Sequence, residues 1–301
     1  MYYVESIFCD ILCTFGITYL SRGNEKMKKF ALFLLTASLC IGMLAGCGTG
    51  SSTVKTSASP STSTASSPDG ALKGVTLKVG TSGLFGPFSY YDKDGTTLIG
   101  YDIDLIAALQ GVLGFEISGG KIQAMDYSAL TTSVAQGKLD MAAAALCVTD
   151  ERKTVIDFSK VYQDSGLVVM VNTNNSAGIS GVNDLAGKTV AVEKGTASHA
   201  YATKYLTSST IQVHDTITTA YLSLEQGKVD AVIQDGPGAA FYIKTATSTK
   251  LKVVGDEFNQ GQSPYAIAFT KGFKYVDQFN AALDELKANG TMDKLAAKWC
   301  K

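Results

Sequence analysis

The chain has 301 residues, a formal net charge of -1 at pH 7, 46% hydrophobic residues and 18% charged residues. This length and apolar content suit a globular protein with enough chain for two modest cores. Lysine and arginine are scattered among acidic residues without forming a basic stripe, so the sequence disfavours nucleic acid as a partner.

The first apolar run, ALFLLTASLCIGMLA over 31–45, is typical of a secretory signal. It follows the basic residues Lys26, Lys28 and Lys29 and ends in small residues. It is also shorter than the roughly 20 apolar residues that a membrane-spanning helix needs. We therefore predict a signal peptide over 1–46, with translation starting at Met27, because a signal normally opens with its basic region.

The segment Leu44-Ala45-Gly46-Cys47 resembles the bacterial lipobox, whose cysteine receives lipid after cleavage in front of it. The resemblance predicts an extracytoplasmic protein anchored to the bacterial cell membrane by lipid on Cys47. A buried core helix is the alternative, but such a helix would not lead directly into a tract of Ser, Thr, Gly, Ala and Pro. We interpret residues 47–71 as the lipidated cysteine and a flexible tether.

The predicted folded part contains few groups of metal-binding or redox chemistry. Cys147 and Cys300 are its only cysteines, and their spacing matches no metal motif, although a disulfide between them stays open. His199 and His214 are the only histidines, without a Ser, Cys or acid at a diagnostic spacing. The sequence predicts no cofactor, no metal and no catalytic residues.

From Leu77 onward, short apolar runs rich in β-formers alternate with helical stretches, which is typical of an α/β fold. We expect strands over 77–79 and 139–146. One helix is expected over 104–113, where Asp102 and Asp104 suit the positive N-terminal end, and another from Tyr127 or Ser128 to a stop at Gly137.

An internal echo indicates two similar lobes. The segment Ser133-Val-Ala-Gln-Gly-Lys-Leu-Asp140 recurs as Ser223-Leu-Glu-Gln-Gly-Lys-Val-Asp230, each a helix end with a glycine stop before a strand. Gly74-Val-Thr-Leu-Lys-Val-Gly80 is likewise echoed by Gly187-Lys-Thr-Val-Ala-Val192. The alternative is chance use of a common helix-stop-strand pattern.

The carboxyl ends of the strands predict where a site would lie. In open α/β sheets, ligands bind just outside these ends. The segments after Val79, Leu146, Val192 and Ile233 should therefore face the site. Two lobes that present these ends to each other would form a cleft.

Several short motifs, weak one by one, occur in order along the chain. They are Gly86-Pro87-Phe88, Gly100-Tyr-Asp-Ile-Asp-Leu105, Val148-Thr-Asp-Glu-Arg152, Ile156-Asp-Phe-Ser159, Val192-Glu-Lys-Gly-Thr196, Val229-Asp-Ala-Val-Ile-Gln-Asp235 and Lys298-Trp299. Across 77–301 the sequence resembles the polar amino-acid-binding proteins of ABC importers, including bacterial glutamine- and histidine-binding proteins.

The resemblance implies a two-lobed, periplasmic-binding-protein-like α/β fold with a hinge and a ligand cleft between the lobes. We expect one lobe over 72–164 and 264–301, the other over 165–263, and hinge strands near 162–166 and 262–266. The implied partners are a free amino acid, an ABC transporter permease and its ATPase, and the implied protein is a monomer.

Two charged residues suit a zwitterionic amino acid, which needs a cation for its carboxylate and a carboxylate for its ammonium group. Arg152 matches the family's carboxylate-binding arginine, and its planar guanidinium suits two parallel hydrogen bonds. A surface salt bridge with Asp150 or Glu151 is the alternative. Asp235 matches the ammonium-binding aspartate, and the alternative is that it caps a turn at Gly236-Pro-Gly.

The start of a predicted helix at Ala197 supplies free amides for the same carboxylate. There Thr196 is either a ligand contact, an N-cap, or both. The resemblance also places Ser82 and Ala145 at the site. Ser82 stands where many relatives carry an aspartate that reads the distal group.

Four further positions have open roles. Phe85 and Tyr127 match aromatic residues that sandwich the ligand side chain, and either could be plain core. Cys147 takes a hydroxyl position and is an inert wall or a thiol contact. Glu193 replaces the lysine of a glutamine binder, and it either draws a cationic side chain or points to solvent.

Two other functions compete with the binding protein. An exported dehydratase on the same scaffold would need an acid or base beside its substrate, and Glu193 is the one unassigned candidate. A ligand-sensing module would normally need a spanning helix and an output domain, and the sequence predicts neither.

Overall fold

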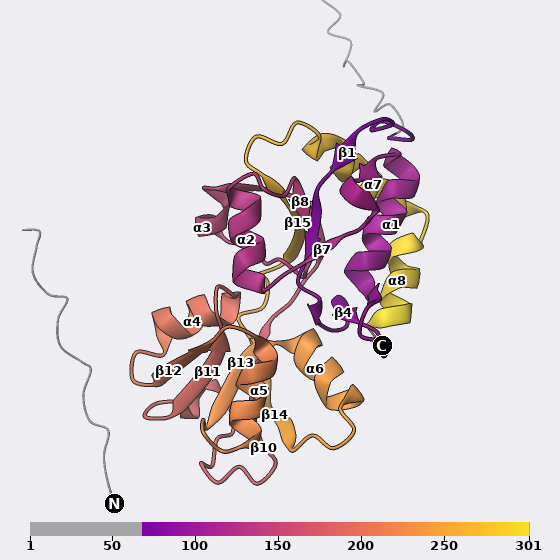
Figure 1. Cartoon of the computed structure of the whole chain (residues 1–301). Helices are drawn as coiled ribbons and strands as arrows, with labels where there is room; N and C mark the ends of the chain where they lie inside the picture. The colour runs from indigo at the N-terminus through magenta and orange to yellow at the C-terminus, as the bar shows by residue number, and fades with distance from the viewer. Residues whose placement is uncertain (1–67, 301) are drawn as a thin grey trace, which may run out of the picture. The chain divides into compact units, whose positions relative to one another are not determined.

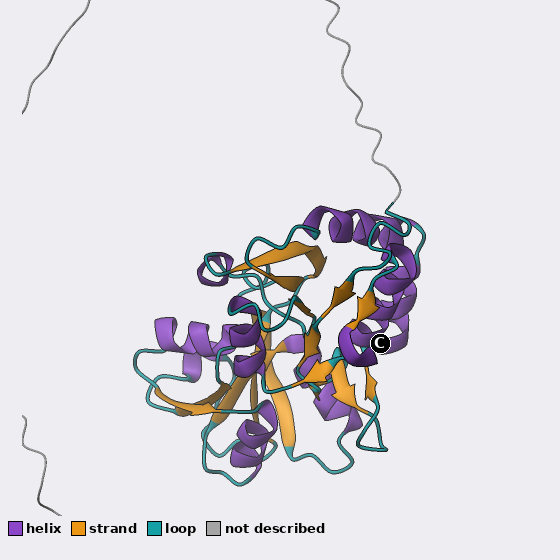
Figure 2. Cartoon of the chain, turned by 45° about the horizontal axis from the view of Figure 1, so that its top comes forward, coloured by secondary structure: helices purple, strands orange, loops and turns teal. Residues whose placement is uncertain are grey.

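The computed structural model describes residues 68–300, so the predicted signal, Cys47 and most of the predicted tether lie outside the described residues. Two five-stranded sheets of mixed direction dominate the described part, each with helices on both faces (Figure 1). Figure 2 shows these helices in purple beside the orange strands. The predicted two-lobed α/β fold is confirmed.

The first lobe is built on the sheet with strand order β7-β2-β8-β15-β9. Its strands are β2 (Val79–Thr81), β7 (Gln123–Ala124), β8 (Met141–Ala142), β9 (Ile156–Gln163) and β15 (Tyr265–Thr270). Its helices are α1 (Tyr101–Leu113), α2 (Tyr127–Ala135), α3 (Asp150–Lys153), α7 (Val276–Ala288) and α8 (Thr291–Trp299). Two small sheets complete the lobe. One pairs β1 (Thr76–Leu77) with β6 (Glu116–Ile117), and the other joins β3 (Leu84–Phe85), β4 (Ser89–Tyr91) and β5 (Leu98–Ile99). A 3₁₀ turn, η1, covers Ser118–Gly120.

The second lobe is built on the sheet with strand order β12-β11-β13-β10-β14. Its strands are β10 (Leu167–Asn172), β11 (Thr189–Glu193), β12 (Thr210–His214), β13 (Ala231–Asp235) and β14 (Leu251–Phe258). Its helices are α4 (Ala197–Tyr205), α5 (Ile217–Glu225) and α6 (Gly236–Thr245), with a 3₁₀ turn, η2, over Val182–Asp184.

Each sheet is buried on both faces, because successive side chains of a strand point to opposite sides. In β15, Ile267 and Phe269 join the core under α1 and α7, whereas Ala268 joins the core under α2. In β10, Val169 and Met170 divide in the same way between two cores. The unbroken apolar runs of these strands follow from this burial.

The internal echo has a structural counterpart. Gly137 and Gly227 both end their helices in the left-handed region, with φ of 68° at each. The Asp140 carboxylate then accepts the amide of Lys78 at 2.6 Å. The Asp230 carboxylate accepts the amide of Thr189 at 2.8 Å. Both lobes therefore join a helix to a strand through the same contact, and chance use of the pattern does not explain it.

Three predicted element boundaries were wrong. The strand expected over 77–79 is interrupted at Lys78, which separates β1 from β2. Helix α1 begins at Tyr101, three residues before the predicted start, because the carbonyls of Pro87 and Phe88 accept its first free amides at 2.9 Å. The strand predicted over 139–146 is regular only at β8. It breaks because Ala145 has a left-handed φ of 48° and donates its amide to the buried carboxylate of Asp102 at 2.7 Å.

The chain crosses between the sheets at 164–166 and returns at 259–264, close to the predicted hinge strands. Folded structure begins before the predicted end of the tether at 71. The amide of Gly70 donates to Val112 at 2.7 Å, and Leu72 is fully buried. The division of the lobes at 164 and 264 stays a prediction that follows these crossings.

Candidate ligand-binding site

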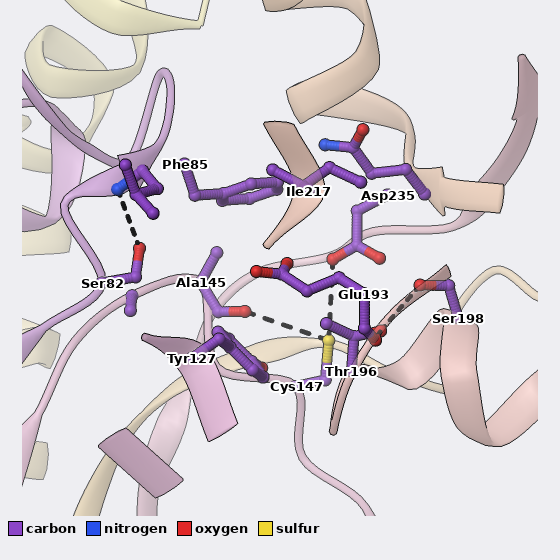
Figure 3. A pocket seen from close by; sticks show the side chains of 13 residues that line it. Ser82, Phe85, Tyr127, Ala145, Cys147, Glu193, Thr196, Ser198, Ile217 and Asp235 are labelled. Carbon is purple, nitrogen blue, oxygen red and sulfur yellow. Dashed lines mark hydrogen bonds between the residues drawn. The ribbon is translucent and has the colours of Figure 1, made fainter. Parts of the chain in front are cut away.

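A cavity of about 450 Å³ lies where the carboxyl ends of strands from both lobes meet (Figure 3). Its walls come from both sheets and from the first turns of α4 and α5. The lining residues are Ser82, Leu84, Phe85, Tyr127, Ala144, Ala145, Cys147, Glu193, Thr196, Ser198, Ile217, Gln234 and Asp235.

The cavity brings together eight of the ten residues predicted for ligand binding, all except Arg152 and Ala197. Ala197 is 5% exposed and packs in the core cluster of the first lobe, although it belongs to α4. Arg152 lies at the edge, where it lines a neighbouring groove between α2 and α4.

Asp235 ends β13 and faces the cavity (Figure 3). Its carboxylate accepts the hydroxyl of Tyr265 at 2.8 Å and the thiol of Cys147 at 3.7 Å. Among residues 68–300 it forms no ion pair within 4 Å. Burial raises the pKa of Asp235 to about 6, although these two donors and the charge of Arg152 oppose the shift.

The turn predicted after Asp235 is in fact the first turn of α6, with Pro237 near its start. Asp235 occupies the N-cap position of this helix but makes no side-chain capping bond. The carboxylate therefore lies at the positive end of α6, but its oxygens accept no hydrogen bond from the first amides of this helix. They face the cavity instead.

Glu193 ends β11 and is 8% exposed, so the solvent-facing alternative for this residue was wrong. Figure 3 shows its carboxyl group directed into the cavity, below the ring of Phe85. Burial raises the pKa of Glu193 to about 8, with smaller upward contributions from Asp235 and Asp126 and a downward one from the amide of Ile217. The cavity therefore contains two carboxyl groups with raised pKa values.

Arg152 connects the two lobes and makes no salt bridge with Asp150 or Glu151. Its Nη1 donates to the carbonyl oxygen of Cys147 at 2.6 Å, and its Nη2 donates to the carbonyl oxygen of Gly195 at 2.5 Å. The guanidinium lies 5.4 Å from the centre of the Tyr127 ring, a favourable cation–π distance. Asp150 pairs instead with Lys153.

Cys147 is 1% exposed and contacts a charged residue of the opposite lobe. Its thiol has two acceptors in reach, Asp235 at 3.7 Å and the carbonyl of Ala145 at 3.9 Å. Burial and the charge of Asp235 raise the pKa of this thiol well above its usual value. Cys147 and Cys300 are both free, so the disulfide left open by the sequence is not formed.

The polar residues at the two ends of the cavity are held by local bonds. The hydroxyl of Ser82 lies 3.2 Å from that of Ser89. Thr196 is the N-cap of α4: its hydroxyl accepts the amide of His199 at 3.2 Å, donates to the backbone carbonyl oxygen of Glu193 at 2.7 Å and lies 2.8 Å from the hydroxyl of Ser198. The predicted capping role of Thr196 is confirmed, and the residue lines the cavity as well.

The two predicted aromatic residues line opposite sides of the cavity in Figure 3. Phe85 stacks on Phe88 at 5.7 Å between ring centres, which fixes its orientation. Tyr127 is 7% exposed and belongs to the core under α2. Both rings therefore pack against the core and also line the cavity, so neither is a plain core residue.

Comparison with known protein families agrees with the sequence motifs found over 77–301. Residues 77–301 match the family model "Bacterial extracellular solute-binding proteins, family 3". The chain belongs to this family.

Within the described range 68–300, no group of three or more His, Cys, Asp or Glu residues is placed to hold a metal ion. None of the helices there has the length and apolar content to span a membrane.

Individual relatives in this family are named for amino acids. The arginine-binding extracellular protein ArtP of Bacillus subtilis (strain 168) is 30% identical, over 91% of this chain and 98% of that protein. The L-cystine-binding protein TcyA of the same strain is 32% identical, over 91% of this chain and 97% of that protein. The solved structure of an ancestral arginine-binding protein bound to arginine is 35% identical, with a TM-score of 0.69 over 75% of this chain and 98% of that chain.

Five lining residues of this solute-binding protein were missed by the sequence analysis: Leu84, Ala144, Ser198, Ile217 and Gln234. Some signal existed for three of them, because Leu84 adjoins Phe85, Ser198 follows Thr196 by two positions and Gln234 immediately precedes Asp235. Ile217 had none. It reaches the cavity because α5 begins there, after the N-cap Thr216.

Proposed function

We propose that this protein binds a free amino acid in the cavity between its lobes and delivers it to an ABC importer. The observation that carries the proposal is Asp235, a carboxylate that faces the cavity and forms no ion pair within the described residues. A buried carboxylate is costly without a cation, and a ligand ammonium group would supply one. Relatives named for arginine and cystine support an amino acid as the ligand.

The ligand carboxylate, carried by the same carbon as the ammonium group, would bind close to Asp235, beside Arg152 and α4; Cys147 contacts both Asp235 and Arg152. The guanidinium of Arg152 donates to two neutral carbonyl oxygens, and a carboxylate is a stronger acceptor than either. The amides of Ala197 and Ser198 belong to the first turn of α4, which has no intrahelical acceptors for them. These groups would orient the amino acid with its ammonium toward Asp235.

Binding would also hold the lobes together. Arg152 and Cys147 of the first lobe already contact Gly195 and Asp235 of the second, and a ligand between these groups would add contacts to both sides. Closure about the crossings at 164–166 and 259–264 would then give the permease and its ATPase a surface that only the loaded monomer presents.

A screen of the twenty amino acids by thermal shift tests this proposal. A ligand that binds only the folded state raises the melting temperature by mass action. At least one amino acid should raise it with a saturating concentration dependence. If none does, and calorimetry also detects no binding, the amino-acid function is wrong.

We further propose that lipid on Cys47 anchors the protein to the outer face of the cell membrane. The support is the Leu44 to Cys47 segment, which lies outside the described residues. In a bacterial host, Cys47→Ala should move the protein from the membrane fraction to the soluble fraction, whereas Cys40→Ala, upstream of the cleavage point, should not. Membrane retention of Cys47→Ala, with no lipid mass on the wild type, would argue against an anchor.

The dehydratase alternative would use Glu193 as its acid. A carboxyl group with a pKa of about 8 can donate a proton near neutral pH, so this alternative has a chemical basis. We favour binding without chemistry because the named relatives above are binding proteins. Mass spectrometry of the ligand after prolonged incubation with the protein should recover it unchanged.

A further inference from the structure

A second cavity, of about 460 Å³, adjoins the first on the side of α5 and α6. The two cavities share four lining residues: Leu84, Phe85, Ile217 and Gln234. Beyond them the second cavity is lined by the aromatic side chains of Tyr90, Tyr221, Phe241 and Tyr242. The site therefore has room beyond Phe85 for a ligand side chain.

Two buried polar atoms at this cavity have no hydrogen-bond partner among the described residues, the Tyr221 hydroxyl oxygen and Gln234 Oε1. Each side chain is 4% exposed, so solvent does not substitute for a partner. Burying such a group unpaired is costly because it loses its hydrogen bonds to water, and native proteins contain few of them. Two at one cavity indicate acceptors for a ligand.

Glu193 stands on the same face of the second sheet as these two residues. Side chains alternate along β11 and β13, so Glu193 points to the side of Ala191, and Gln234 points to the side of Val232. Ala191 and Val232 pack in one core cluster with Tyr221 of α5. Burial, then Tyr242, then Glu193 raise the pKa of the Tyr221 hydroxyl, which agrees with proximity between Glu193 and Tyr221.

The position of Gln234 is restricted by its neighbours. Gly238 of α6 passes so close that a Cβ atom there would lie 2.5 Å from Gln234 Nε2 and 2.4 Å from the Phe85 ring. Glu193 is likewise restrained by the backbone amide of Ile217 at the start of α5. These acceptors are therefore held in place before a ligand arrives, which favours selective binding.

The charges of the site identify the ligand class. An amino acid placed as proposed above pairs its carboxylate with Arg152 and its ammonium with Asp235. Glu193 then remains as a third ionisable group, a carboxyl group whose pKa burial raises to about 8, and no lysine lines either cavity. A cation on the ligand side chain would stabilise the ionised form of Glu193 and pair with it.

We propose that Glu193, Tyr221 and Gln234 bind the cationic head of the ligand side chain, a guanidinium or ammonium group. This inference rests on the proposed amino-acid function. A carboxylate, a hydroxyl oxygen and an amide oxygen together match the several N–H donors of such a head, which carries no acceptor of its own. The ring pair of Tyr90 and Phe241, 5.0 Å apart, adds faces that favour a cation.

L-arginine and L-citrulline test the inference, because citrulline replaces the guanidinium with a neutral group of similar shape. By calorimetry, the wild-type protein should bind arginine or lysine, and arginine should bind at least roughly 30-fold more tightly than citrulline. Glu193→Gln should reduce that ratio to a few-fold. Tyr221→Phe should weaken arginine several-fold and leave citrulline nearly unchanged.

Glu116→Gln, an exposed carboxylate of β6, is the matched control and should leave the ratio unchanged. If citrulline or glutamine binds the wild type as tightly as arginine does, the cationic subsite is wrong, but the amino-acid function still stands. This comparison uses the wild type alone, so it does not depend on whether a variant folds. An unchanged ratio in Glu193→Gln would overturn it too. If no amino acid binds at all, the proposed function fails and the cationic subsite fails with it.

Discussion

The hydroxyl oxygen of Tyr265 lies 2.8 Å from the carboxylate of Asp235, joining β15 of the first lobe to β13 of the second. The same hydroxyl lies 2.9 Å from that of Ser165, in the segment that crosses between the sheets. Tyr265 is fully buried and also meets Phe88 edge to face at 5.1 Å. One side chain thus links the ligand-facing carboxylate, the crossing segment and the core of the first lobe.

Tyr265→Phe should shift the pH dependence of ligand binding upward. The Tyr265 hydroxyl lowers the pKa of Asp235 against the effect of burial, so its loss should move that pKa above about 6. More of the carboxyl is then protonated at pH 6 to 7, where binding of an ammonium group should weaken, and affinity should recover above pH 8. Calorimetry between pH 5.5 and 9 measures this, with Tyr91→Phe as an exposed control.

An identical pH profile for Tyr265→Phe and the wild type would show that Asp235 does not bind the ligand's cation. A loss of affinity that does not change with pH would assign Tyr265 a packing role alone.

Arg152→Ala should weaken amino-acid binding by about 2 to 5 kcal/mol, because it leaves a desolvated ligand carboxylate without its charged partner. The unfolding free energy should fall less, since Arg152 is only half-buried and its bonds go to two backbone carbonyls. Lys153→Ala, which removes a neighbouring cation that pairs with exposed Asp150, should bind as the wild type does. Wild-type affinity of Arg152→Ala in calorimetry would remove this residue from the site.

Much of the fold was predictable from local patterns. The echo around Asp140 and Asp230 marked two similar helix-to-strand joints, and the structure repeats the same carboxylate contact in both. Strand ends placed Glu193 and Asp235 near each other because the carboxyl ends of parallel strands meet at one edge of a sheet, and the two facing lobes placed Cys147 opposite them. These predictions needed only periodicity, glycine stops and the order of motifs.

Long-range bonds were not predictable. Asp102 was predicted only to suit the positive end of a helix, yet it is fully buried and accepts the amide of Ala145 at 2.7 Å and the hydroxyl of Tyr162 at 2.8 Å. It thereby bends the pocket wall that was expected to be a strand. Tyr221 gave no signal, and the adjacency of Gln234 to Asp235 did not show that the Gln234 amide oxygen is unpaired, because an unpaired acceptor exists only once packing has removed its other partners.

Asp235→Asn should separate an amino-acid receptor from a receptor for simple carboxylates. The substitution keeps the shape of the side chain and removes the charge that offsets a buried cation. Amino-acid binding should fall sharply, by about 2 kcal/mol or more. A ligand analogue without the ammonium group should bind the wild type poorly, and its disadvantage relative to the amino acid should shrink in the variant.

Asp230→Asn provides a contrast, because Asp230 accepts the amide of Thr189 and does not line either cavity. Asp230→Asn should lower the free energy of unfolding but leave the preference for the amino acid over the analogue without an ammonium group nearly unchanged. Equal losses for both ligands in Asp235→Asn would mean that this residue supports the start of α6 and takes no part in recognising the ammonium group.

Glu193→Gln should stabilise the ligand-free protein increasingly as pH rises from about 5 to 8.5. Burial raises the pKa of Glu193 from its usual 4.5 to about 8 in the folded state. A carboxyl whose pKa is higher in the folded state contributes stability below its unfolded pKa and loses it as pH rises through the folded pKa. Glutamine has no such titration, so the difference in unfolding free energy should favour the variant by more than about 1 kcal/mol at pH 8.5.

Urea unfolding of both proteins at pH 5, 7 and 8.5, without amino acid, measures this difference. Asp102 and Asp235 also have pKa values raised to about 6, but both proteins contain them, so their contribution largely cancels. With saturating arginine the order should reverse at pH 8.5, because only the ionised Glu193 pairs with the ligand's cation and binding adds stability by mass action. A stability difference that stays constant from pH 5 to 8.5 would mean that Glu193 is hydrated in the free protein, and that its carboxylate reaches solvent when the lobes open.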